Sequence, residues 1–360
     1  MSDAAGSLRQ PASERIDFRV CRNGDESEIV QLLDLPFDDE LATEHWRWKF
    51  RHWPTDVANV WLGVADQQLA FHFGGMPVRF CVDGSICTAM VAVDVMTAPR
   101  FRREGVLTRG IGLAFENWKA NGVAFTFGLP NERWGSRKEA AGLQELFPLQ
   151  WLVRPLRPER IAARRFDMPW LRHAGVISSL WRRLPRKQLR RDASIEFESI
   201  EKADGRFDTL WKRCAANAAF STVRDSAWVQ WRFLSSPTRD YDLVLAHRGN
   251  DAVGYYASRI DETAGKKSAF LAEFVGIDND ASIRESILAE VISKTDDAGA
   301  DLLATLAVPG TKVYELLRRA GFMRGPAFTV YMVPFAQDLP MERLRNPQNW
   351  NLSGADFDVV

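Results

Sequence analysis

Cysteine is scarce in this sequence, which has four in 360 residues: Cys21, Cys81, Cys87 and Cys214. They form no Cys-x-x-Cys pair, and no Cys/His set has the spacing of zinc ligands. This scarcity argues against a metal site and against a disulfide framework. Cys81 and Cys87 flank an expected turn at Asp83-Gly84, and we expect them to be reduced thiols rather than a disulfide.

An excess of charge is missing as well. Lys+Arg and Asp+Glu both count 47, so the formal net charge is zero and the pI is about 7. This balance gives no reason to expect a nucleic acid or an acidic surface as partner. No window is apolar over the length of a membrane span, and residues 1–11 lack the apolar core of a signal peptide. We therefore expect a cytoplasmic protein.

The sequence does contain enough apolar material for folded domains. Apolar residues make up 46% and charged residues 26%, as in globular proteins, and 360 residues suffice for two domains. Residues 1–15 are small, polar and charged, and we expect them to be disordered.

The most informative stretch runs from Pro99 to Ile111. Ala89–Met96 before it is apolar and predicts a buried strand, whereas Leu107–Ala120 has apolar residues at helical spacing. The first N–H groups of a helix lack internal partners, and Gly105 lets a ligand approach the backbone, so this arginine-rich turn is typical of a pyrophosphate site. The alternative is an ordinary strand–turn–helix with solvated arginines. Neither GxxxxGK[ST] nor GxGxxG is present.

At these residues the sequence resembles the GNAT superfamily of acyl-CoA-dependent N-acyltransferases. Motif A of that family reads Pro-x-x-Arg-x-x-Gly-x-Gly/Ala, which here gives Pro99, Arg102 and Gly105, with Leu107 in place of the second glycine. The form Arg-Arg-x-Gly-Val-Leu is most similar to acetyltransferases of the enhanced-intracellular-survival type. The resemblance implies an α/β fold with a mixed sheet, and acetyl-CoA or another acyl-CoA as co-substrate.

The resemblance also implies which residues contact the cofactor. Backbone N–H groups of the strand before motif A would polarise the thioester carbonyl, and they belong to Val95, Met96 and Thr97. The pyrophosphate contacts fall on Arg102, Arg103, Glu104, Gly105, Val106, Leu107 and Thr108. Asn131 matches an asparagine near the cofactor thiol, although it also suits the N-cap of the helix expected at Glu132–Ala141.

The catalytic groups are less well defined by the sequence. Asp94, Glu139 and His72 are candidates for the general base, and each also has a purely structural explanation. The tyrosine that many GNAT enzymes use as an acid is missing, because Lys138 and Leu317 hold the corresponding positions. Tyr314 lies one helical turn away. A further hypothesis makes the terminal carboxylate of Val360 the base.

An internal repeat predicts two domains. Trp48-Lys-Phe-x-x-x-Pro54 matches Trp231-Arg-Phe-x-x-x-Pro237, and each phrase is followed by a probable hairpin, at Val60–Phe73 and at Asp242–Tyr256. We expect two tandem GNAT domains, at residues 16–155 and 195–336. The second is degenerate, because the strand Ala269–Ile277 is followed by Asp278-Asn-Asp-Ala-Ser with no basic cradle. We expect the aromatic phrase itself to be core packing.

Residues 156–194 predict a basic linker helix. From Arg154 to Arg191 there are twelve Lys/Arg and two acidic residues. This helix either makes peripheral contact with an anionic membrane or turns its basic face to water or to acidic residues of its own protein, and we favour the second explanation. Residues 337–360 form a polar tail that we expect to be anchored by Trp350.

The resemblance thus implies an acyl-CoA-dependent N-acyltransferase, more specifically an N-acetyltransferase that uses acetyl-CoA. Its acceptor would be an amine of a small molecule or amino sugar. Two alternatives stay open. One is a non-catalytic acyl-CoA sensor, favoured by the missing tyrosine. The other is an aminoacyl-tRNA-dependent aminoacyltransferase with tandem GNAT domains, against which the intact Arg-Arg-x-Gly turn argues.

Overall fold

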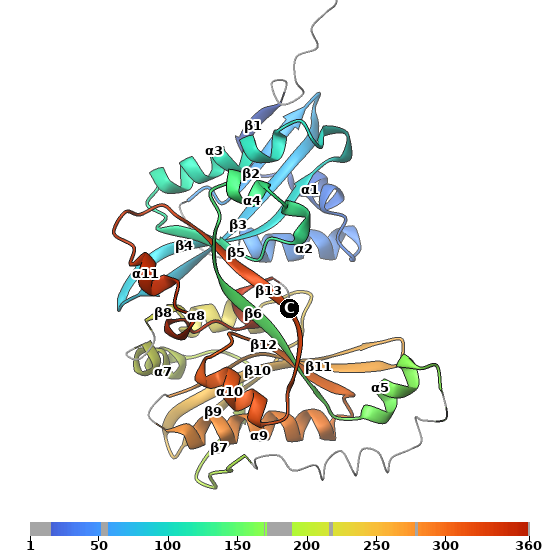
Figure 1. Cartoon of the computed structure of the whole chain (residues 1–360), viewed down its shortest axis with the longest axis vertical. Coiled ribbons are helices and arrows are strands. Elements are labelled where there is room, and N and C mark those ends of the chain that lie inside the picture. Colours follow the sequence, from blue (N-terminus) through green and yellow to red (C-terminus); the bar gives the residue numbers. More distant parts are fainter. Residues whose placement is uncertain are drawn as a thin grey trace, which may run out of the picture. The chain divides into compact units, whose positions relative to one another are not determined.

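The computed structural model describes residues 16–51, 57–168, 170, 189–215, 219–277 and 280–358. The chain divides into two compact units, each made of three segments (Figure 1). Unit 1 comprises Met1–Val78, Thr88–Gln144 and Met332–Leu339. Unit 2 comprises Arg79–Cys87, Glu145–Tyr331 and Pro340–Val360. The expected disorder of residues 1–15 lies outside the described residues, and the expected domain limits at 155 and 195 remain predictions.

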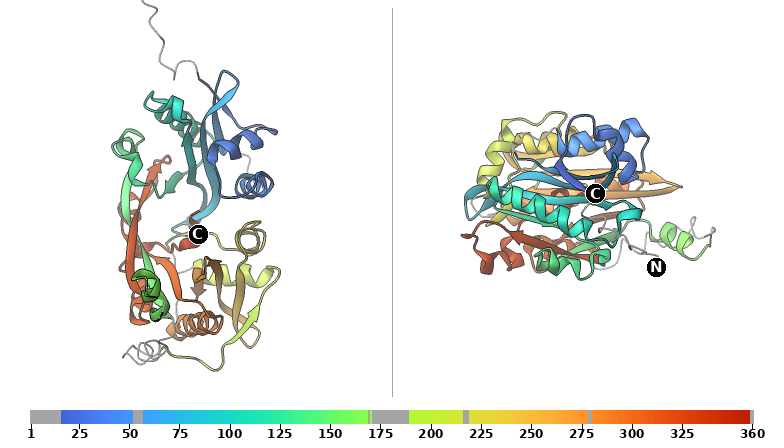
Figure 2. Two further views of the ribbon diagram at one scale, coloured as in Figure 1. Left: turned by 90° about the vertical axis from the view of Figure 1, so that its right-hand side faces the viewer. Right: turned by 90° about the horizontal axis from the view of Figure 1, so that it is seen from above.

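Unit 1 is a twisted sheet with helices on both faces. Its strands follow the order β1 (Asp17–Val20), β2 (Val60–Ala65), β3 (Gln68–Val82), β4 (Ser85–Thr97) and β5 (Phe125–Gly128). β1, β2 and β3 pair antiparallel, whereas β4 and β5 are parallel. In the left view of Figure 2, α3 lies on one face and α1 and α2 on the other. These helices span Glu26–Leu33 (α1), Asp39–Phe50 (α2) and Val106–Ala120 (α3).

The core of unit 1 forms where α3 packs on the sheet. Ile111, Ala114 and Trp118 recur at helical spacing and are buried. Trp118 Nε1 donates to the Ala58 carbonyl at 2.8 Å, so its polar atom is satisfied inside the core. Gly110 allows the close approach, since a Cβ there would lie 2.4 Å from Phe71 Cε1.

Unit 2 also contains strands in a mixed arrangement. Its strand order is β13, β6, β12, β11, β10, β9, β7, and the β11–β12 pair is parallel. α9 packs on β10 and β11 through buried Ile283, Ile287 and Val291. The strands span Gln144–Pro155 (β6), Glu196–Ser199 (β7), Asp242–Arg248 (β9), Asp251–Thr263 (β10), Lys266–Gly276 (β11), Leu302–Ala307 (β12) and Met323–Pro334 (β13).

Short elements complete unit 2. The strand β8 pairs with residues 80–82 of β3, the part of the hairpin that belongs to this unit. Trp350 in the C-terminal segment is buried, as expected, and its ring contacts Phe80, Phe147 and Phe220. The remaining elements are α5 (Pro158–Arg165), α7 (Gly205–Ala215), β8 (Phe220–Thr222), α8 (Ser226–Val229), α9 (Ala281–Asp297), α10 (Lys312–Arg319) and α11 (Met341–Leu344).

The sequence predicts two helices, one at Glu132–Ala141 and one in the linker, that the structure describes differently or only in part. The helix expected at Glu132–Ala141 is wrong: a 3-10 turn at Glu132–Trp134 and a short helix α4 at Arg137–Ala140 stand there, because Gly135 takes a φ of 48° that interrupts a helix. Of the linker helix, α5 is described, and residues 169 and 171–188 lie outside the described residues.

The basic residues around α5 bind acidic residues of their own unit. Arg157 pairs with Asp296 at 3.2 Å, and Arg164 pairs with Asp301 at 2.7 Å. This agrees with the favoured explanation for the described part of the basic segment. Within the part of the chain that the structure describes, no helix has both the length and the apolar character needed to cross a membrane.

Candidate functional site

The Pro99–Ile111 stretch forms a turn between β4 and α3 in unit 1. A 3-10 turn at Pro99–Phe101 follows the end of β4, and α3 begins at Val106. Arg103 and Gly105 have positive φ angles of 69° and 77°. Glycine adopts this conformation without the steric cost that other residues have, so Gly105 suits the last position before the helix.

The turn presents backbone donors that the protein does not use. Among the described residues, no acceptor is found for the six N–H groups from Arg103 to Thr108. A run of such groups in a tight turn at a helix N-terminus forms a concave site for an anion. The position of Gly105 is open, since a Cβ added there would meet nothing within 4 Å.

The side chains of the turn separate into exposed and core-packed groups. Arg103, Glu104 and Thr108 are exposed, whereas Val106 is buried and Leu107 packs on the core of unit 1. Leu107 therefore directs its side chain inward and leaves its backbone available. Arg102 Nε donates to the carbonyl of Thr97 at 3.0 Å, which ties the turn to the end of β4.

The parallel strands β4 and β5 pair only briefly. Their register runs from Ala89–Phe125 to Val91–Phe127, and β5 ends at Gly128 while β4 continues to Thr97. Among the described residues, the backbone of β4 beyond Val91 therefore has no strand partner on the β5 side. This unpaired edge includes Val95, Met96 and Thr97. The Thr97 hydroxyl is buried and has no hydrogen-bond partner among the described residues.

Asp94 lies on this part of β4 in an unusual backbone conformation. Its φ is 49°, which is rare for a residue other than glycine and marks a local irregularity of the strand. Lys49 Nζ donates to its carboxylate at 2.7 Å, and the Lys49 side chain is only 2% exposed. Burial alone would raise the pKa of Asp94, but the charge and hydrogen bond of Lys49 outweigh it and hold that pKa below its usual value.

His72 supports Asp94 from the neighbouring strand β3. His72 Nδ1 lies 2.6 Å from the Asp94 carbonyl oxygen, and Trp46 Nε1 donates to His72 Nε2 at 3.4 Å. An indole can only donate, so the tautomer that satisfies both contacts carries its proton on Nδ1. Burial lowers the pKa of His72, against the opposing effect of Asp94, and favours the neutral ring.

The other candidates lie on other elements. Glu139 is exposed on α4, and Asn131 is exposed immediately before the 3-10 turn. Tyr314, in unit 2, is buried and its hydroxyl accepts from Arg324 Nε at 2.9 Å. Val360 lies outside the described residues. The structure therefore brings Asp94 and His72 together and does not add Glu139 to that pair through any described side-chain contact.

Sequence reasoning missed Lys49. We assigned the Trp48-Lys-Phe phrase to core packing, and these residues are indeed buried. A lysine between two core aromatic residues requires a buried counter-charge, and this is the signal that would have pointed to Asp94.

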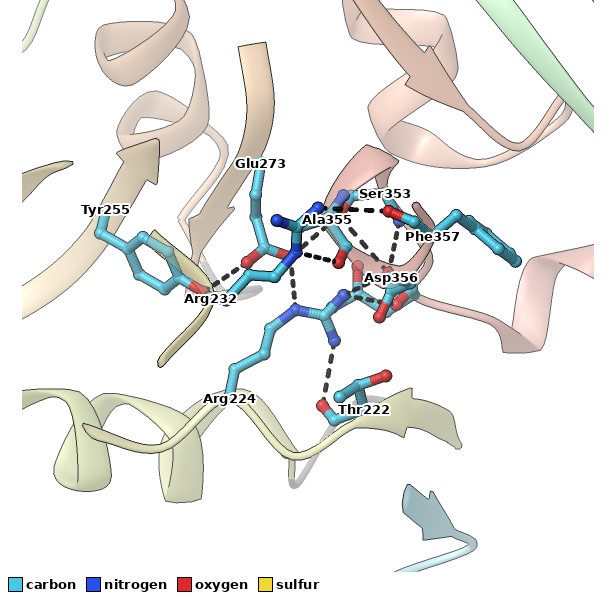
Figure 3. Close-up of polar contacts among 10 residues, drawn as sticks. Thr222, Arg224, Arg232, Tyr255, Glu273, Ser353, Ala355, Asp356 and Phe357 are labelled. Atoms are coloured by element: carbon cyan, nitrogen blue, oxygen red, sulfur yellow. Dashed lines mark hydrogen bonds and ion pairs between the residues drawn. The ribbon is translucent and has the colours of Figure 1, made fainter. Parts of the chain in front are cut away.

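Unit 2 has a second buried charge network, made of different residues. Arg224 contacts Glu273 and Asp356, and Tyr255 donates to Glu273 at 2.6 Å (Figure 3). Arg232 holds the same C-terminal segment by donating to the carbonyl of Ala355 at 2.8 Å. This network links the C-terminal segment at Asp356 to Glu273 of β11 through Arg224.

Comparisons with known proteins agree with this architecture. Residues 17–137 match the family described as "Acetyltransferase (GNAT) domain". No curated protein matches the chain.

Three similar solved structures share the fold of the chain. A GCN5-related N-acetyltransferase from Anabaena variabilis has a TM-score of 0.66 at 13% identity, over 89% of this chain and 73% of that one. A probable N-acyltransferase from Enterococcus faecalis gives 0.61 at 13%, over 88% and 72%. N-myristoyltransferase from Saccharomyces cerevisiae, solved with myristoyl-CoA, gives 0.59 at 11%, over 89% and 82%. Residues 17–137 are thus similar to a GNAT acetyltransferase domain, and the likeness to these solved structures shows a shared fold.

Proposed function

We propose that the protein is an acyl-CoA-dependent N-acyltransferase whose cofactor site is the β4–α3 turn of unit 1. The observation that carries this proposal is the run of unused N–H groups from Arg103 to Thr108 at the start of α3. These groups, with Arg102 and Arg103, would hold the CoA pyrophosphate, since oriented donors and cations stabilise its negative charge.

The acyl arm would then lie along the unpaired edge of β4. The N–H groups of Val95, Met96 and Thr97 are the donors that we propose for the thioester carbonyl. The cofactor would add its own polar groups where β5 no longer pairs with β4. We propose that the Asn131 side chain lies near the thiol of CoA.

The reaction joins an acceptor amine to the acyl group. The amine nitrogen attacks the thioester carbonyl carbon, and the C–N bond forms as the C–S bond breaks. CoA leaves as a thiolate and takes up a proton, while the amine loses one. We propose that the Asp94 carboxylate accepts the proton that the amine loses, with Glu139 as the alternative base. His72 is then a positioning residue, because both of its ring nitrogens are already hydrogen-bonded.

The cofactor site is tested by Gly105→Asp. The new carboxylate would stand where the pyrophosphate is proposed to bind, and we expect CoA affinity to fall at least a hundredfold. Gly122→Asp is a matched control at the other end of α3, since Gly122 also has a φ of 77° and open space around its Cβ position. Calorimetric titration with CoA should separate the two variants. Equal affinities would remove the site from this turn.

The non-catalytic sensor is the second candidate, and the absence of a tyrosine at Lys138 favours it. An assay of free-thiol release distinguishes the sensor from the enzyme. Purified protein is mixed with an acyl-CoA and a panel of amines, and the release of free CoA thiol is measured. CoA binding without thiol release from any pair would support the sensor. The panel should run from acetyl-CoA to myristoyl-CoA and include amino sugars, because the acetyl group and the acceptor are both proposals.

We also propose that units 1 and 2 are copies of one GNAT fold. Both contain a short parallel strand pair, β4–β5 and β11–β12. Both bury the cation of the repeated phrase, Lys49 in one and Arg232 in the other. Only the first has the arginine-rich turn, so we assign the cofactor to unit 1.

A further inference from the structure

Unit 2 contains a cavity of about 400 Å³ that the proposed reaction does not use. It lies where β11 ends, beyond the point at which β11 and β12 stop pairing at Leu271 and Thr305. Val275 and Gly276 form one wall, and Trp350 of the C-terminal segment forms another. A volume of this size accommodates a small metabolite and lies at the lower end of the range for ligand sites.

The cavity is cationic on one side. Arg284 of α9 and Lys312 of α10 both border it, and none of the described residues that line it is acidic. Arg284 Nη2 donates to the Gly276 carbonyl at 2.9 Å, which fixes the guanidinium beside the cavity. Lys312 is exposed at the start of α10. Two cations around one space favour a doubly charged phosphate over a single carboxylate.

The backbone near Lys312 adds to this charge. Thr311 caps α10 by accepting from the Tyr314 N–H at 3.2 Å, while the N–H groups of Lys312 and Val313 have no acceptor in the described chain. The start of α9 differs, because Asp280 accepts from the Ser282 N–H at 2.9 Å and places a carboxylate there. A phosphate is therefore favoured at the α10 side of the cavity.

Amide side chains also line the cavity. Gln348, Asn349 and Asn351 come from the C-terminal segment, and each side-chain amide has both donors and acceptors. The Asn351 N–H donates to the Phe220 carbonyl at 2.9 Å, so this segment is fixed in place. Amide side chains that share a cavity with two cations suit hydroxyl groups on the same ligand.

From this arrangement we infer that the unit 2 cavity binds a small phosphate monoester that carries hydroxyl groups. Arg284 and Lys312 hold the phosphate, and the amides of the C-terminal segment hold the hydroxylated part. The ligand is not the acyl donor, because the loop after β11 has no counterpart of the arginine-rich turn. The site is therefore separate from the proposed cofactor site of unit 1.

Titration of the full-length protein with glycerol 3-phosphate, inorganic phosphate and glycerol tests this inference. Saturating CoA is present throughout to occupy the unit 1 turn. We expect glycerol 3-phosphate to bind more tightly than inorganic phosphate, and glycerol alone not to bind. Absence of glycerol 3-phosphate binding, or equal affinity for inorganic phosphate, would overturn the inference.

Variants locate the binding. Lys312→Gln should weaken glycerol 3-phosphate about tenfold, because it removes a charged hydrogen-bond donor from an exposed position where folding does not depend on it. Asn351→Ala should reduce the affinity to that of inorganic phosphate. Lys266→Gln, at the exposed first residue of β11 in the same unit, should have no effect. Equal affinity of wild type and Lys312→Gln would place the ligand elsewhere and overturn the site.

Discussion

At the scale of the residue, buried polar groups carry most of the information about unit 1. Lys49, Asp94 and His72 hold one another in a fixed geometry on the strand that we propose to bind the acyl arm. A buried charge pair of this kind is costly to desolvate. We therefore expect the Lys49–Asp94 pair to hold Asp94 in position rather than to add to the stability of the fold.

His72 makes the stability of the fold depend on pH. Burial lowers its pKa in the folded state, so the unfolded chain binds more protons just below the usual histidine pKa of about 6.5. Stability from His72 is therefore full above that value and falls as pH falls through it. Urea unfolding at pH 7.5 and 5.5 should show a larger loss for wild type than for His72→Gln, by about 1 kcal/mol. Equal losses would show that His72 is not held neutral.

Arg224 is the central residue of the unit 2 network. Arg224→Met leaves Glu273 and Asp356 buried without their shared cation, and we expect a loss of about 3–5 kcal/mol in the free energy of unfolding. Arg79→Met is the control, because Arg79 pairs with Asp225 but is 45% exposed, and its loss should be below about 1 kcal/mol. Denaturant titration of both variants measures these losses. An equally small loss for Arg224→Met would show that the network does not stabilise the folded state.

At the scale of the element, α3 has to meet two demands. Its N-terminus must offer free N–H groups, and its inner face must approach the sheet closely. Both demands fall on glycines, at Gly105 before the helix and at Gly110 within it.

Two glycines of α3 allow this to be tested. Gly110→Ala places a Cβ 2.4 Å from Phe71 Cε1, and we expect it to destabilise the protein by about 1–3 kcal/mol. Gly112→Ala meets nothing within 4 Å and should stabilise it by up to about 1 kcal/mol, since alanine favours a helix. Thermal unfolding should move in opposite directions for the two. A destabilised Gly112→Ala would contradict the open space assigned to it.

Elements with strong local signals could be predicted from the sequence. The hairpin predicted at Val60–Phe73 is formed by β2 and the first part of β3, and α3 begins at Val106, one residue before the predicted start. Apolar periodicity and a glycine fix such elements locally. The Lys49–Asp94 pair could not be predicted in this way, since 45 residues separate its members. The turn was identified correctly, but the geometry around Asp94 depends on three elements that meet only in the folded chain.

At the scale of the whole molecule, the chain passes through the two units more than once. Unit 1 needs residues 332–339, whose Phe335 donates its N–H to the Ala124 carbonyl at 2.9 Å and packs its ring on Phe115. Unit 2 needs residues 79–87, which pair with β8. No sequence signal marked either exchange, because both join segments that are distant along the chain.

A fragment of residues 16–144 tests this interdependence. It lacks Phe335 and leaves Phe80 and Cys81, both buried in the intact protein, without their partners in β8. We expect the fragment to aggregate or to unfold without a cooperative transition, whereas the full chain unfolds cooperatively. Size-exclusion chromatography and thermal unfolding of the two provide the measurement. A monomeric fragment with a sharp transition would show that unit 1 is self-sufficient.

The hydrogen bond from Phe335 to Ala124 has a consequence for synthesis on the ribosome. β5 is synthesised about 200 residues before Phe335, whose N–H donates to the carbonyl of the residue that precedes β5. During translation this edge of the sheet therefore stays exposed until Phe335 has been synthesised. A nascent chain that stalls before Phe335 would expose an unpaired edge strand to chaperones and to other nascent chains.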